Sequence, residues 1–257
     1  MNIGSPSILV PVRVAVAGAG GRMGRETIRA VEEADGMEVV GQAHRADDLA
    51  ALLGQTKPDV LVDFTVPDAV MPNARAALSA RVAPVVGATG LTETDLAELR
   101  ELCARHDTPA LVAPNFAIGA VLLMRFAAEA ARFLPDVEIT EMHHERKIDA
   151  PSGTAVRTAQ LIADARGEAG VVPLSPPSGV FESAPGARGG KVGSVPVHSI
   201  RLPGFVASQE VIFGGPGQRL SLRHDSIDRT SFMPGVVLAI RRVRSLPGLV
   251  VGLENLL

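Results

Sequence analysis

Tryptophan and tyrosine are absent from this 257-residue sequence, and cysteine occurs once, as Cys103. A single cysteine permits neither an internal disulfide nor a cysteine metal cluster, which favours a reducing cytoplasmic setting. Eight phenylalanines and a formal charge of -3 provide neither a base-stacking surface nor a basic field for nucleic acid. No apolar run approaches the ~18 residues of a membrane span, and residues 1–11 do not resemble an export signal. We therefore expect neither nucleic acid nor a membrane as a partner.

What the first half does contain is an alternation of short apolar runs and helical patterns. Strands are predicted over residues 12–17, 37–43, 60–64, 82–86 and 110–113. Helical patterns separate most of these strands, although the pattern over residues 47–53 is weak. This alternation predicts an α/β fold whose N-terminal part is a doubly wound parallel sheet.

The pattern changes after residue 115, where a second domain is expected to begin. Helices are predicted over residues 118–133, 155–166 and 231–244, and strands over 137–142, 197–202, 206–213 and 219–224. The glycine- and proline-rich residues 167–194 are predicted to form a long mobile loop. The consecutive strands predict a C-terminal α+β domain with an open mixed or antiparallel sheet.

The segment GAGGRMG, residues 18–24, directly follows the first predicted strand and opens the first helix. Glycines there let the backbone turn sharply and approach a pyrophosphate, whose charge the helix N-terminus and Arg22 would stabilise. The alternative is a tight turn without a ligand. The spacing departs from GxGxxG, because Met23 stands at the third position and the glycine follows at residue 24.

Other predicted strand ends also bear on a dinucleotide. His44 and Arg45 stand where an acidic residue usually binds the ribose of NAD, which favours NADPH; alternatively both are solvated loop residues. GATG, residues 87–90, and APNF, residues 113–116, follow the fourth and fifth strands. Ligands bind at this edge of an open α/β sheet, so we expect both loops to line the cleft, although each alone is compatible with an ordinary turn.

The segment EMHHERKIDAPSGTA, residues 141–155, combines His143, His144 and Lys147 near the end of a predicted strand. Histidine delivers protons near neutral pH, and the cluster predicts a cationic pocket for a substrate that carries carboxylates. The competing interpretation is a solvated charged loop. No metal is expected, because adjacent histidines lack the i, i+4 spacing of a zinc pair.

The end of the same segment predicts a helix start that binds an anion. Ser152 or Thr154 would cap the helix, and Gly153 would let the backbone approach a ligand. Other cationic or titratable side chains of the second domain could reach this pocket, although each alone is more typical of a surface or sheet-pairing residue. They are His198, Arg201, Arg223, His224 and Arg229.

Together with DFTVP, VVGATG and APNFAIGA, these two segments resemble the 4-hydroxy-tetrahydrodipicolinate reductase family, formerly dihydrodipicolinate reductase, from about residue 12 onward. The resemblance implies a Rossmann domain of residues 1–117 and 230–257 and a substrate-binding and oligomerisation domain of residues 118–229. It also implies a cytoplasmic homotetramer that uses NADPH or NADH to reduce a cyclic dicarboxylate in lysine and diaminopimelate biosynthesis.

By resemblance, His143 is similar to the family's proton-transferring histidine and Lys147 to its catalytic lysine. The predicted substrate contacts are His144, Ser152, Gly153, Thr154 and Arg229. The predicted cofactor contacts are Gly18, Ala19, Gly20, Gly21, Arg22, Met23, His44, Arg45, Gly87, Ala88, Thr89, Ala113, Pro114, Asn115 and Phe116. The chain departs from the family pattern at His44, where an acidic residue is usual, and at Ala88, where threonine is common.

Three other functions compete with this interpretation. A semialdehyde dehydrogenase requires a cysteine nucleophile, for which Cys103 on a predicted helix is poorly placed. An amino-acid dehydrogenase would use the same cofactor but would not explain the histidine segment. A non-catalytic NAD(P)-sensing protein would keep the fold without the chemistry, and the intact His143 and Lys147 argue against it.

Overall fold

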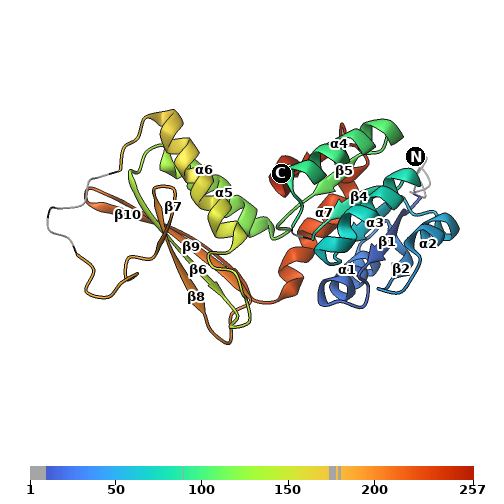
Figure 1. Ribbon diagram of the computed structural model, residues 1–257, viewed down its shortest axis with the longest axis horizontal. Coiled ribbons are helices and arrows are strands. Elements are labelled where there is room, and N and C mark those ends of the chain that lie inside the picture. Colours follow the sequence, from blue (N-terminus) through green and yellow to red (C-terminus); the bar gives the residue numbers. More distant parts are fainter. Residues whose placement is uncertain (1–9, 89, 174–177, 179–180) are drawn as a thin grey trace, which may run out of the picture. The chain divides into compact units, whose positions relative to one another are not determined.

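The computed structural model describes residues 10–88, 90–173, 178 and 181–257, so the predicted cofactor contact Thr89 lies outside the described residues. The chain divides into two compact units, Met1–Phe116 with Phe232–Leu257, and Ala117–Ser231. In Figure 1 the first unit accordingly combines the N-terminal part of the chain, coloured blue to green, with its orange to red C-terminal segment.

The first unit contains a six-stranded sheet in the order β11-β5-β4-β3-β1-β2. Its strands are β1 (Val12–Ala17), β2 (Met37–Ala43), β3 (Val60–Asp63), β4 (Ala83–Val86), β5 (Ala110–Val112) and β11 (Leu249–Val251). Every neighbouring pair is parallel, which confirms the predicted doubly wound sheet. The sequence interpretation missed β11, because three residues are too few to give a periodic signal.

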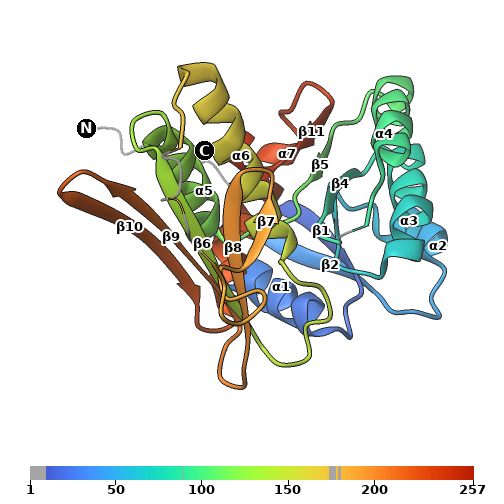
Figure 2. The ribbon, with the colours of Figure 1, turned by 60° about the vertical axis from the view of Figure 1, so that its left-hand side comes forward.

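Helices cover both faces of this sheet: α1 (Arg22–Glu33), α2 (Leu49–Thr56), α3 (Pro67–Ser79), α4 (Glu93–His106) and α7 (Met233–Val243). The helix α1 packs beside α7, whereas α2, α3 and α4 follow one another on the opposite face (Figure 2). Buried side chains of α3 and α4 form one apolar core with β4 and β5. The weak helical pattern over residues 47–53 corresponds to α2, whose first turn is capped by the Asp48 carboxylate.

The second unit contains a five-stranded sheet in the order β10-β9-β6-β8-β7. Its strands are β6 (Asp136–His143), β7 (Gly190–Val192), β8 (Val195–Arg201), β9 (Ala207–Gly215) and β10 (Gln218–Ser226), and its helices are α5 (Ile118–Ala131) and α6 (Gly153–Ala169). The β6–β8 pair is parallel and the other pairs are antiparallel, so the sheet is mixed, as predicted. The helices α5 and α6 cover one face and share an apolar core with the sheet (Figure 1).

The prediction of a single loop over residues 167–194 is wrong at both ends. The helix α6 continues to Ala169, where Gly170 ends it with a left-handed φ of 65°. Near the other end, β7 pairs antiparallel with β8. The strand β7 has only one apolar residue, Val192, so it carries no alternating pattern. Residues 174–177 and 179–180 of this segment lie outside the described residues.

The short helices η1 (Arg229–Phe232) and η2 (Leu253–Leu256) complete the secondary structure. No helix in the described ranges is long and apolar enough to cross a membrane.

Candidate active site

The glycine turn between β1 and α1 is fixed by close backbone contacts. Gly18 has a φ of 76°, and a Cβ on it would stand 2.9 Å from the carbonyl oxygen of Phe64. A Cβ on Gly24 would stand only 2.2 Å from the carbonyl oxygen of Gly18. Glycine is therefore required at positions 18 and 24 for the turn itself, which explains the departure from the usual spacing. No side chain caps the start of α1, where Gly21 is the N-cap residue.

A cavity of about 620 Å³ opens at this turn, at the carboxyl ends of β1, β2 and β3. The strand β1 lies between β2 and β3, so this is the point where the strand order reverses and where doubly wound sheets bind ligands. Of the predicted cofactor contacts, the cavity is lined by Gly18, Gly20, Gly21, His44 and Arg45. Its size, its glycine lining and the uncapped helix start fit a dinucleotide pyrophosphate.

The His44 side of the cavity carries an acidic residue that the sequence interpretation missed. The Asp47 carboxylate lines the cavity and accepts a hydrogen bond of 2.7 Å from the His44 main-chain N–H. The His44 ring lies over the glycine turn, since a Cβ on Gly20 would stand 3.2 Å from its Nδ1. Arg45 also lines the cavity and is exposed, so its guanidinium is accessible to a phosphate group.

Phe64 connects the cavity to the loops after β4 and β5. A Cβ on Gly87 would stand 2.1 Å from its ring, and the ring of Phe116 packs edge-on against it at 5.7 Å. The remaining predicted contacts do not line the cavity: Ala19 and Ala113 are buried, Met23 and Asn115 are half-buried, Ala88 packs on the core of α3 and α4, and Arg22 and Pro114 are exposed. Phe64, Thr65 and Asn73 also line the cavity, although the sequence interpretation named none of them as a cofactor contact.

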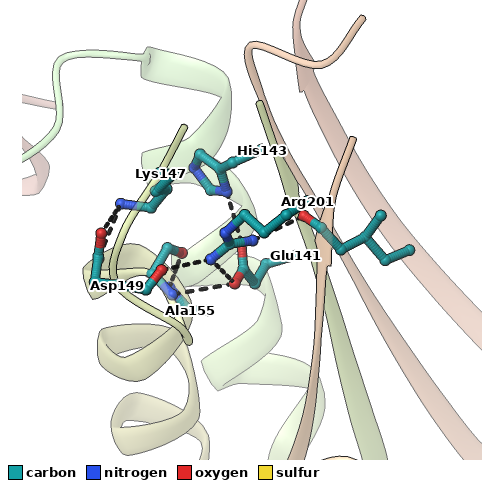
Figure 3. Close-up of polar contacts among 8 residues, drawn as sticks. Glu141, His143, Lys147, Asp149, Ala155 and Arg201 are labelled. Carbon is teal, nitrogen blue, oxygen red and sulfur yellow. Dashed lines mark hydrogen bonds and ion pairs between the residues drawn. The ribbon is translucent and has the colours of Figure 1, made fainter. Parts of the chain in front are cut away.

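The predicted proton-transfer residues lie in the second unit, on and after the central strand β6. Glu141 and His143 are two residues apart and therefore share one face of the strand. Nδ1 of His143 lies 2.6 Å from Oε2 of Glu141, whose side chain is fully buried (Figure 3). Arg201 of the neighbouring strand β8 donates to both oxygens of this carboxylate, at 2.7 and 3.0 Å.

The Glu141 carboxylate is ionised despite its burial. Desolvation alone would raise its pKa, but hydrogen bonds from His143, Arg201 and Ser199 outweigh this penalty and lower the pKa to about 2. A buried carboxylate that keeps its charge is a fixed negative partner for the imidazole of His143. The sequence interpretation missed Glu141, although an acidic residue two positions before a candidate proton donor on a strand was a usable signal.

Lys147 is held by a second carboxylate. Its Nζ donates to both oxygens of Asp149, at 2.7 and 2.9 Å, and this contact lowers the pKa of Asp149. Arg201 also donates to the Asp149 main-chain oxygen at 2.7 Å, which ties the loop after β6 to β8 (Figure 3). The predicted cationic pocket therefore contains the carboxylates of Glu141 and Asp149 in addition to its basic groups.

The helix α6 starts beside this cluster with Ser152 as its N-cap. The Ser152 hydroxyl accepts from the Ala155 N–H at 3.3 Å, and the Ser152 N–H donates to Glu141 at 3.2 Å. Gly153 faces open space, since no atom lies within 4 Å of the position of a Cβ. Nδ1 of His144 is buried and has no hydrogen-bond partner among the described residues.

Of the other basic residues considered, only Arg201 reaches the cluster through a described contact. His198 pairs with Glu138, Arg223 pairs with Asp225, and His224 packs against Gly119. Arg229 lies in η1, and no described hydrogen bond or ion pair joins it to the cluster. The described residues contain no group of three or more metal-ligating side chains. Burial raises the pKa of the Cys103 thiol to about 11, so it is not an activated nucleophile.

A dinucleotide cavity in one unit and a histidine–lysine cluster at a capped helix start in the other define an NAD(P)H-dependent oxidoreductase. The family models described as "Dihydrodipicolinate reductase, N-terminus" and "Dihydrodipicolinate reductase, C-terminus" match residues 12–116 and 119–257. The chain belongs to the dihydrodipicolinate reductase family.

Individual relatives agree with this assignment. The 4-hydroxy-tetrahydrodipicolinate reductase of Streptomyces griseus is 51% identical, with 96% of this chain and 98% of the relative covered. That of Desulfitobacterium hafniense is 46% identical over the same shares. The solved structure of dipicolinate-bound dihydrodipicolinate reductase from Paenisporosarcina sp. TG-14 is 41% identical, with a TM-score of 0.85 and coverage of 96% of this chain and 100% of that chain.

Proposed function

We propose that this protein uses NADPH or NADH to reduce 4-hydroxy-tetrahydrodipicolinate to tetrahydrodipicolinate in the biosynthesis of lysine and diaminopimelate. One observation carries the proposal: His143, bound to a buried carboxylate, stands beside Lys147 at the start of α6. The family relationship, at 46% to 51% identity with reductases of this name, supports the same reaction.

The cavity at the end of β1 would hold the cofactor. Gly18, Gly20 and Gly21 line it and would receive the pyrophosphate, and the loops with Gly87 and Phe116 would border the nicotinamide. Arg45 would bind a 2′-phosphate, which would favour NADPH over NADH. When bound there, the cofactor supplies the hydride.

His143 and Lys147 supply the proton and stabilise charge. The substrate ring becomes electron-rich when it accepts a hydride, and it must then gain a proton. The ammonium of Lys147 stabilises the negative charge that develops. His143 delivers the proton when its ring is protonated on both nitrogens. The half-buried setting of both side chains limits competition from water.

The two substrate carboxylates bind around the start of α6. Main-chain N–H groups at Gly153 and Thr154, the Ser152 cap and the buried Nδ1 of His144 provide contacts for one of them. Arg229 is the substrate contact of the second carboxylate. The solved Paenisporosarcina relative was determined with dipicolinate, a related aromatic dicarboxylate, which supports this class of ligand.

We also propose that the protein is a cytoplasmic homotetramer that assembles through its second unit. The single cysteine is compatible with a reducing compartment. Light scattering of the purified protein measures the mass directly, and a monomeric mass at micromolar concentration would refute the tetramer.

The deciding experiment couples the purified protein to the synthase that forms its substrate from pyruvate and aspartate semialdehyde. Oxidation of NADPH and of NADH is followed separately, with each component omitted in turn. The proposal requires oxidation that depends on every component. Cofactor binding without oxidation would instead indicate a sensor or a dehydrogenase that acts on another small acid.

A further inference from the structure

Glu141 occupies a position where the fold alone favours an apolar residue. The same face of β6 carries Val137 and Ile139, both buried in the core that α6 covers. Glu141 continues this row and is also fully buried. A buried ion pair is weak support for stability, because the desolvation of both charges offsets their attraction. The presence of Glu141 at this position therefore indicates a role in the neighbouring cluster of His143 and Lys147.

Every described contact of the carboxylate is with a hydrogen-bond donor. Oε1 accepts from Arg201 Nη2 and from the Ser152 N–H, and Oε2 accepts from Arg201 Nη1. An ionised carboxylate can only accept, so the 2.6 Å contact requires that Nδ1 of His143 carries its hydrogen. In the neutral ring, Nε2 is then the unprotonated nitrogen, and it is the one that exchanges a proton with a ligand.

The register of the sheet holds this arrangement in place. His143 lies opposite Arg201 and Glu141 lies opposite Ser199 in the parallel β6–β8 pair. Arg201 therefore reaches back along the strand and binds the Glu141 carboxylate with two hydrogen bonds, a planar geometry that restricts both side chains. The orientation of His143 thus depends on two strands rather than on its own loop.

We infer that Glu141 is a positioning residue for proton transfer, which fixes His143 in the Nδ1–H form with Nε2 directed to the ligand, while Arg201 holds Glu141. The inference rests on the proposed function, because it assigns His143 the proton transfer. A purely structural role is the alternative, since Glu141 also binds the start of α6 through Ser152.

Glu141→Gln separates the two roles. The glutamine amide keeps the size of the side chain but cannot accept on both oxygens, so the defined orientation of His143 is lost. General acid–base catalysis contributes about 10²- to 10⁴-fold, and we expect a fall in kcat of about 10²-fold with KM within about threefold. Glu138→Gln is the matched control: it changes a carboxylate of the same strand that pairs with Arg188 and His198 away from the cluster, so kcat and KM should both stay within about threefold.

A second measurement needs no variant of Glu141 and covers the case in which Glu141→Gln fails to fold. The protein is labelled with ¹⁵N-histidine, and the signals of His143 are identified by their loss in His143→Ala. At a pH where the ring is neutral, Nδ1 is expected to carry the proton and Nε2 to be bare.

The outcomes distinguish the inference from the proposed function. An Nε2–H ring, or a folded Glu141→Gln variant with unchanged kcat, overturns the inference while the wild type remains a reductase. A rise in KM alone assigns Glu141 a structural role and also overturns it. A wild type that shows the Nδ1–H ring but no turnover refutes the proposed function instead.

Discussion

Lys147 binds both carboxylate oxygens of Asp149, at 2.7 and 2.9 Å from its Nζ (Figure 3). A substrate that brings negative charge to this ammonium must compete with Asp149. Because both side chains are partly exposed, the pair contributes at most about 1 kcal/mol, equivalent to about fivefold in affinity. We predict that Asp149→Asn lowers the substrate KM by up to about fivefold in steady-state assays. Asp164→Asn, an exposed change on α6, is the control; an unchanged or higher KM for Asp149→Asn would contradict the prediction.

His143→Ala is predicted to lower kcat by about 10²- to 10⁴-fold, the usual contribution of a positioned proton donor. Lys147→Ala is predicted to lower it by about 10²- to 10³-fold, the usual contribution of one group that stabilises developing charge. Both side chains lie in the second unit and the cofactor cavity lies in the first. NADPH affinity, measured by fluorescence titration, should therefore stay within about twofold. His198→Ala, whose ring pairs with Glu138 away from the cluster, should keep wild-type turnover. Full activity of either cluster variant would refute its assigned role.

Arg45→Ala is predicted to affect the two cofactors differently. A charge-assisted hydrogen bond to a phosphate contributes about 1.5–3 kcal/mol, so KM for NADPH should rise at least about tenfold. NADH lacks the phosphate, and its KM should change by less than about threefold. The ratio of the two KM values measures the effect, and equal changes for both cofactors would show that Arg45 is only a solvated loop residue.

The ionised Glu141 makes stability depend on pH. Its folded pKa of about 2 lies below the ordinary value of 4.5, so its stabilisation is complete above about pH 5 and is lost as pH falls toward 2. The shift corresponds to about 3 kcal/mol. We predict that the difference in unfolding free energy between wild type and Glu141→Gln, from urea titrations, shrinks over this range. A difference that stays constant between pH 5 and pH 2 would contradict the prediction.

Replacing each of two glycines of the first unit by alanine is predicted to have opposite effects on the stability of the protein. Gly24→Ala places a Cβ 2.2 Å from the Gly18 carbonyl oxygen, so it should lower the melting temperature and abolish NADPH binding. Gly54 lies exposed within α2 with no atom within 4 Å of a Cβ position. Gly54→Ala should therefore stabilise the protein by about 0.5–1 kcal/mol, as measured by thermal and urea unfolding. Equal effects of the two changes would contradict the geometry.

The sequence was sufficient where local patterns decide the structure. The strands β3 and β4 follow from short apolar runs beside turns, and the glycine turn and His44 follow from their positions after β1 and β2. The partnership of Glu141 with Arg201 could not be predicted, because 60 residues separate them and only the parallel register of β6 and β8 brings them together. Phe64 and Asn73 were missed for the same reason, since the cavity is assembled from three strand ends.

The division of the first unit between the two ends of the chain also bears on how the protein is made. The helix α7 and the outer strand β11 are synthesised after the whole second unit, yet β11 completes the edge of the sheet beside β5. The second unit is continuous in sequence and can fold on the ribosome as soon as it has emerged. The first unit cannot complete its sheet until β11 has left the exit tunnel, and the edge of β5 stays unpaired until then. A ribosome that stops before residue 249 would therefore release a chain with a complete second unit and an open, aggregation-prone sheet edge in the first.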